Sequence, residues 1–119
     1  MADEEIFNVR DKKTFEEKVL NNKNPVVVGF FSPSSESSKT MIPRVEQVVD
    51  DINHDKQRRV SFAQVDINAL KDLSMEYGIK TAPVLSLFME GKVQDQYPGI
   101  LDFPDIKEFV DSNLKAQRG

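Results

Sequence analysis

Apolar and polar residues follow one another in blocks along the chain, and the spacing within each block predicts its secondary structure. Short runs dense in Val, Ile, Leu and Phe are typical of strands. Apolar residues three or four positions apart indicate helices with one face on a core. By these criteria we expect strands at 6–9, 26–31, 60–65, 84–89 and 92–97, and helices at 11–21, 36–54, 69–77 and 103–115.

Several local signals sharpen these elements. The unbroken run VVVGFF at 26–31 indicates a central strand buried on both faces. Pro43 lies inside the second helix and should kink it. The first helix can begin at Asp11 or at Thr14, which has capping-box spacing to Glu17, and Asp102 is a candidate N-cap for the last helix. Residues 55–59 read as a charged turn.

The order of elements is β-α-β-α-β-α-β-β-α, which predicts one α/β sandwich over residues 1–119. The crossovers between strands are expected to be right-handed, and the last hairpin adds antiparallel strands, so the sheet is mixed. Four helices are expected to flank it, with an ordered core at about 6–114.

Composition excludes several classes of function. The chain has 119 residues, with 16 basic and 20 acidic side chains, so its net charge is 16 − 20 = −4. An acidic surface is unsuited to nucleic acid, and the basic stretch Lys56–Arg59 reads as a solvated turn. No apolar run approaches the ~20 residues of a membrane span. Residues 1–5 are acidic and do not read as a signal or transit peptide.

The absence of cysteine narrows the chemistry further. There is no Cys, no Trp and a single histidine, His54. A disulfide or thiolate nucleophile is therefore impossible, and zinc binding is unfavourable. No GxGxxG motif is present, so we expect no nucleotide cofactor and no metal.

Landmarks along the chain resemble the thioredoxin family, from about Ile6 to Leu114. They include the central strand Pro25–Phe31, the helix start Lys39–Pro43, and the segment Val65–Asn68. Tyr77–Pro83 resembles the segment that ends in the family's cis-proline, and Phe88–Gly91 and Pro98–Gly99 resemble its hairpin and the glycine after it. The details look most like the bacterial and mitochondrial branch.

The departures from that family concern its chemistry. The resemblance places the WCGPC signature on Ser34-Ser35-Glu36-Ser37-Ser38, so that both cysteines are serines, at Ser35 and Ser38. The family's buried acid falls on Gly29. Either a cavity opens there or a neighbour such as Phe31 or Leu85 fills the space. Because alcohols cannot form disulfides, dithiol exchange is closed to this chain.

Serine catalysis is disfavoured in place of the thiols. A serine nucleophile needs an adjacent base. His54 lies sixteen residues beyond Ser38, or about 24 Å along a helix. Lys39 is adjacent, but an exposed lysine stays protonated at neutral pH. We expect Ser34 or Ser35, together with Glu36, to cap the helix. Phosphorylation of the serine cluster and metal binding by a carboxylate and hydroxyl cluster remain alternatives.

The resemblance also implies a peptide-binding groove. In the family, the residue before the cis-proline pairs its backbone with an extended client, and here that residue is Ala82. The groove would be formed by Ser34, Ser35, Glu36, Thr81, Ala82, Pro83, Gly99 and Ile100.

These features predict a redox-inactive, thioredoxin-like adaptor or chaperone-like module, expected to be monomeric and intracellular, either cytoplasmic or mitochondrial. The expected partner is an extended polypeptide, not nucleic acid or membrane. The alternative is a thiol-disulfide oxidoreductase in which cysteines have been replaced by serines. Simultaneous loss of both cysteines, the Trp, the Gly-Pro pair and the acid favours a natural loss of the chemistry.

Overall fold

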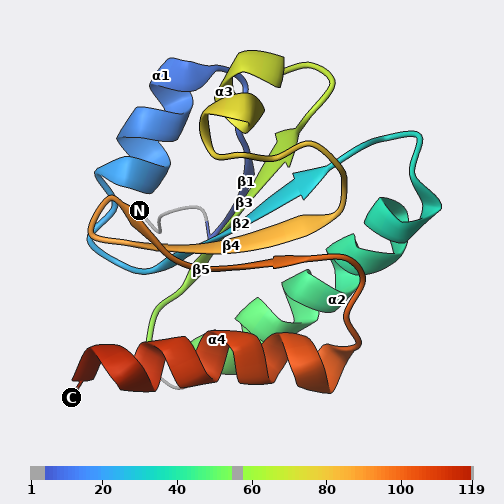
Figure 1. Ribbon diagram of the computed structural model, residues 1–119. Helices are drawn as coiled ribbons and strands as arrows, with labels where there is room; N and C mark the ends of the chain where they lie inside the picture. Colours follow the sequence, from blue (N-terminus) through green and yellow to red (C-terminus); the bar gives the residue numbers. More distant parts are fainter. Residues whose placement is uncertain (1–4, 55–57, 119) are drawn as a thin grey trace.

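A computed structural model describes residues 5–54 and 58–118 and shows a five-stranded mixed sheet between two pairs of helices (Figure 1). The strands lie in the order β1-β3-β2-β4-β5. Their bounds are β1 Ile6–Asn8, β2 Val26–Phe31, β3 Ser61–Asp66, β4 Val84–Met89 and β5 Lys92–Pro98. The helices are α1 Lys12–Phe15, which continues as the π-helical η1 Glu16–Leu20, then α2 Glu36–Asn53, α3 Lys71–Glu76 and α4 Phe103–Arg118.

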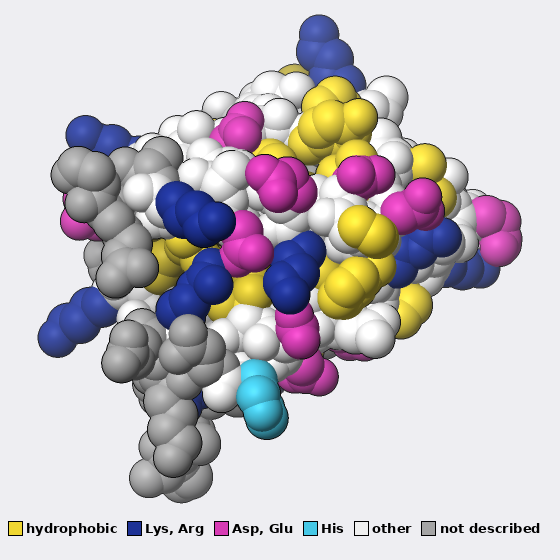
Figure 2. Space-filling view, turned by 90° about the horizontal axis from the view of Figure 1, so that it is seen from below, with side chains coloured by type: hydrophobic (Ala, Val, Ile, Leu, Met, Phe, Trp, Pro, Cys, Tyr) yellow, Lys and Arg dark blue, Asp and Glu magenta, His cyan; other side chains and the backbone are white. Residues whose placement is uncertain are grey.

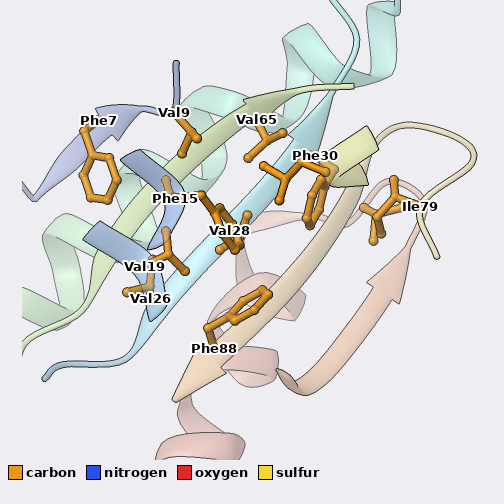
Figure 3. Close-up of a cluster of buried hydrophobic side chains, with 13 residues drawn as sticks. Phe7, Val9, Phe15, Val19, Val26, Val28, Phe30, Val65, Ile79 and Phe88 are labelled. Carbon is orange, nitrogen blue, oxygen red and sulfur yellow. The ribbon is translucent and has the colours of Figure 1, made fainter. Parts of the chain in front are cut away.

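Strand β2 is the centre of the sheet, as its unbroken apolar run predicts. It pairs in parallel with β3 and antiparallel with β4, and all six of its residues are buried. Its side chains alternate between two hydrophobic clusters. Val28 and Phe30 pack on the side of α1 and α3 (Figure 3), whereas Val27 and Phe31 pack with residues of α2 and α4.

The first, third and last helices begin or end at residues that differ from the predicted bounds or decide between alternatives. Asp11 is the N-cap of α1 rather than Thr14, because its carboxylate accepts a hydrogen bond from the Thr14 N–H at 2.8 Å. That bond holds the pKa of Asp11 below its ordinary value. Helix α3 is shorter than predicted and begins at Lys71, because residues 66–70 form a turn in which the Leu70 N–H donates to the Asp66 carbonyl. Helix α4 extends beyond 115, to Arg118.

The predicted turns at Gly78 and at Glu90–Gly91 are confirmed, whereas the predicted kink at Pro43 is not tested. Gly78 follows the C-cap of α3 with a φ of 73°, and Glu90 and Gly91 form the hairpin turn with positive φ at both positions. Helix α2 continues through Pro43, and a kink there stays a prediction. Residues 55–57 of the expected charged turn lie outside the described residues.

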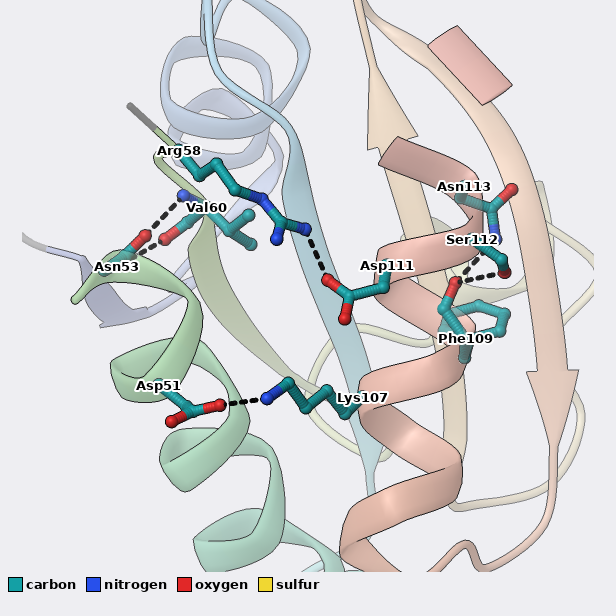
Figure 4. Close-up of polar contacts among 9 residues, drawn as sticks. All are labelled: Asp51, Asn53, Arg58, Val60, Lys107, Phe109, Asp111, Ser112 and Asn113. Atoms are coloured by element: carbon teal, nitrogen blue, oxygen red, sulfur yellow. Dashed lines mark hydrogen bonds and ion pairs between the residues drawn. The ribbon is translucent and has the colours of Figure 1, made fainter. Parts of the chain in front are cut away.

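Polar contacts join α2, α4 and the start of β3 on the lower face of the molecule (Figure 4). Arg58 pairs with Asp111, and Lys107 pairs with Asp51. The hydrogen bond and the charge of Lys107 hold the pKa of Asp51 below its ordinary value. The Asn53 side chain both donates to and accepts from the Val60 backbone at 2.8 Å. Acidic and basic side chains are interspersed over this face (Figure 2), so it carries no extended field of one sign.

In the described part of the chain, no helix is both long and apolar enough to cross a membrane.

The space beside Gly29 is filled by Phe31. A Cβ atom at Gly29 would lie 2.3 Å from two ring atoms of Phe31 and 3.0 Å from the Phe62 ring. The rings of Phe31 and Phe62 meet edge to face, with centroids 6.1 Å apart. Of the two arrangements expected at this position, the structure therefore has the one in which Phe31 occupies the space, and Gly29 is required by packing.

We predict that Gly29→Ala lowers the free energy of unfolding by about 1–3 kcal/mol, because the added methyl group must displace the Phe31 ring. Gly29→Asp should lower it further, since a carboxyl group would also be buried without a partner. Thermal unfolding followed by circular dichroism measures both effects.

The control is the same pair of substitutions in a Phe31→Leu background, where the smaller side chain leaves room at position 29. There the cost of Gly29→Ala should shrink by at least about 0.5 kcal/mol. An equal cost in both backgrounds, or a higher melting temperature for Gly29→Asp, would contradict the packing explanation.

Candidate functional site

The predicted groove residues come from three segments that meet at one end of the sheet. Phe30, near the end of β2, pairs with Val84 at the start of β4, so the loop after β2 and the segment before β4 lie at the same edge. Val84 also pairs with Pro98 at the end of β5. The Gly99 N–H then donates to the Pro83 carbonyl at 2.9 Å. The Ala82–Pro83 peptide bond is cis.

The serines at the positions where the family resemblance places two cysteines hold the loop together. Ser35 is the N-cap of α2, and its hydroxyl oxygen accepts a hydrogen bond from the Ser38 N–H at 3.2 Å. Ser38 is buried, and its hydroxyl oxygen accepts from the Ser32 N–H at 3.1 Å. The Ser35 N–H in turn donates to the Ser32 carbonyl at 3.0 Å. These reciprocal bonds fix the path of the chain from β2 into α2.

Among the residues that the structure describes, no histidine or carboxylate is hydrogen-bonded to either hydroxyl. His54 is the C-cap residue at the opposite end of the 18-residue helix α2. The Lys39 ammonium lies 3.6 Å from the Glu36 carboxylate, an exposed ion pair in the first turn of α2. Ser35 and Ser38 therefore have structural hydrogen bonds and lack the partner that a nucleophile requires.

The third segment, residues 99–102 after β5, is bonded to α2. The Arg44 guanidinium donates to the Leu101 carbonyl at 2.8 Å and lies 3.2 Å from the Asp102 carboxylate. The Leu101 N–H contacts the sulfur of Met41 at 3.2 Å. Ile100, between Gly99 and this clamp, keeps 49% of its surface exposed. The loop is thus held in place while an apolar side chain remains on its surface.

The backbone before the cis-proline is unpaired. Within the described residues, the N–H and C=O groups of Ala82 and Thr81 make no hydrogen bond. Ala82 is half-buried and Thr81 is exposed. The segment therefore presents free donors and acceptors to a ligand, as the edge of a sheet does.

Two supporting residues were not found by sequence reasoning. The Asn68 amide donates to the Ser32 hydroxyl at 3.0 Å, which ties the segment after β3 to the serine loop. Arg44 donates a hydrogen bond to the Leu101 carbonyl, in the loop after β5, although the two residues are 57 positions apart in the sequence. An Arg on a helix gives no local signal of such a long-range bond, whereas the position of Asn68 just after a predicted strand could have pointed to this edge of the sheet.

A metal site finds no support in the part of the chain that the structure describes. No three His, Cys, Asp or Glu side chains gather there in an arrangement that could hold an ion.

Known proteins share this arrangement. A mixed sheet between two helix pairs, with a cis-proline opening β4 opposite the N-terminal loop of α2, defines a thioredoxin-like fold. The family model for thioredoxin matches residues 6–112. The chain therefore belongs to the thioredoxin family.

Individual relatives give the same result. Mitochondrial thioredoxin from Bos taurus is 35% identical over 105 residues, which cover 87% of this chain and 60% of that protein. Thioredoxin from Pseudomonas aeruginosa is 30% identical over 111 residues, covering 93% and 98%. A protein disulfide-isomerase like 2-2 from Arabidopsis thaliana is 30% identical over 102 residues, covering 86% and 22%. The chain thus spans only about 60% of the length of the mitochondrial relative.

We predict that Ser35→Ala lowers the free energy of unfolding by about 0.5–2 kcal/mol, because it removes the N-cap of α2. Ser37→Ala is the matched control, since the exposed Ser37 makes no hydrogen bond among the described residues and should leave stability unchanged. Denaturant titration measures both. Equal stability of the two variants would rule out the capping role.

Proposed function

We propose that this chain is a redox-inactive member of the thioredoxin family that binds an extended polypeptide segment by strand addition at Ala82. The observation that carries the proposal is the unpaired backbone of Thr81 and Ala82 beside the exposed Ile100. A peptide that lies along this segment gains backbone hydrogen bonds without any requirement for particular side chains.

The chemistry of the loop supports a non-covalent role. No thiol is available to form a mixed disulfide with a client. The serine hydroxyls at the two positions are engaged in holding the loop. Recognition then depends on shape and backbone pairing alone, so clients exchange by simple dissociation and affinity per contact is low.

The relatives favour one alternative, a disulfide oxidoreductase presented with serines in place of cysteines. Several of them are thioredoxins by name. Sequencing the gene distinguishes the two hypotheses. Cysteine codons at positions 35 and 38 would support the oxidoreductase, and serine codons there would rule it out. For either function we propose a mitochondrial location, because two of the relatives are mitochondrial thioredoxins.

The test is capture of clients from a lysate through a photo-crosslinking amino acid placed at Ile100, on the rim of the groove. We expect clients to be captured by the otherwise unchanged chain and lost in Ala82→Pro, because proline removes the backbone donor at position 82. Ala82→Ser is the control, since it keeps the N–H group and should retain the same clients.

Circular dichroism must show that the proline variant is folded. If it is not, replacement of the Ala82 amide by an ester through semisynthesis removes the same donor without a ring. Identical capture by the chain with and without the donor would overturn strand addition at this position. The absence of any captured protein would overturn peptide binding by the groove.

A further inference from the structure

A cavity of about 450 Å³ opens beside the proposed strand-addition segment. It lies between α3 and the residues that follow it, and Lys80, on its wall, is two positions before Ala82. Two positions along the chain span at most about 7 Å. A client strand that pairs with Ala82 would therefore pass the mouth of this cavity within one or two residues.

The wall of the cavity is mainly apolar. Ile67 and Ile79 contribute to it, and Met75, which is 70% exposed, is the most exposed large hydrophobic residue of the described chain. The cavity is large enough for an aliphatic or aromatic side chain. Burial of such a side chain against Met75 and Ile79 removes apolar surface from water on both partners.

Ser74 places an unsatisfied polar group behind this wall. Its residue is 2% exposed, and its hydroxyl has no hydrogen-bond partner among the described residues. Buried hydroxyl groups are usually paired. Its oxygen is itself almost inaccessible to solvent, so Ser74 belongs to the packing behind the cavity wall and offers no direct contact to a ligand.

The two charged residues that line the cavity are both basic. Lys71 and Lys80 line it, and no acidic residue does. Neither lysine forms an ion pair among the described residues, whereas Lys12, on the neighbouring helix α1, lies 3.3 Å from the Glu76 carboxylate. On a chain with a net charge of −4, two unpaired cations at one cavity are a local departure from the overall charge.

We propose that this cavity selects clients in which an acidic residue accompanies a large apolar residue. The apolar side chain enters between Met75 and Ile79, and the carboxylate lies between Lys71 and Lys80. The inference rests on the strand addition proposed above and specifies the substrate class of that site. Exposed lysines confer selectivity more than affinity, so the preference weakens as salt is raised.

The experiment is selection of a random peptide library displayed on phage against the immobilised chain at low salt. We expect the recovered peptides to be enriched in Asp or Glu within two residues of Leu, Met or Phe. The double variant Lys71→Glu/Lys80→Glu should recover peptides enriched in Lys or Arg instead. Lys23→Glu/Lys92→Glu changes the net charge equally, at exposed positions at the opposite end of the sheet, and should leave the acidic preference intact.

Synthetic peptides then measure how much the acidic residue contributes to binding affinity. For a recovered sequence, replacement of its Glu by Lys should weaken binding by about fivefold in the unchanged chain and strengthen it in Lys71→Glu/Lys80→Glu.

The two proposals fail in different ways. Peptides that require the Ala82 donor but show no acidic preference, or keep it after the double lysine substitution, would overturn the cavity's selectivity and leave strand addition standing. Peptides that respond to Lys71 and Lys80 but bind equally without the Ala82 donor would overturn strand addition. Recovery of no peptide would overturn both.

Discussion

Complete burial of β2 is the constraint on which the rest of the structure depends. A strand that is apolar on both faces must be covered by helices on both sides, which places α1 and α3 on one face and α2 and α4 on the other. It must also be paired along both edges, by β3 and β4. Where β2 ends, the chain leaves the sheet beside the start of β4, so the serine loop and the cis-proline segment are brought together by the core rather than by contacts of their own.

Ser35 and Ser38 have structural roles at the positions where the resemblance to thioredoxins places two cysteines. The Ser35 hydroxyl accepts from the Ser38 N–H in the first turn of α2, where N–H groups have no partner within the helix, and the Ser38 hydroxyl accepts from the Ser32 N–H in the loop after β2. Side-chain oxygens are good caps at such positions, and sulfur is a poorer acceptor. Serine at these two positions therefore excludes thiol chemistry and holds the loop between β2 and α2 in place.

Much of this fold could be predicted from the sequence because the signals were local and strong. The run at Val26–Phe31 and the spacing of Met41, Val45, Val48 and Ile52 predict β2 and α2 almost to the residue. The start of α3 was missed because no capping side chain marks it, and Leu70 occupies the N-cap position without a side-chain hydrogen bond.

The candidate site was predicted only in part. Ala82, Pro83 and the serine loop came from a resemblance to known motifs, and their placement at one edge follows from strand register. The Arg44 clamp and the cavity beside Lys71 and Lys80 depend on tertiary packing between distant segments. Periodicity and spacing within a segment carry no information about which distant segment it will meet.

The packing of the Phe31 ring into the space beside Gly29 also restricts how the two positions can vary. Two positions that share one volume cannot vary independently, so each restricts what the other can become. An acid at position 29 would have to displace the Phe31 ring, so the residue at position 31 decides which side chains position 29 can hold at a given cost in stability.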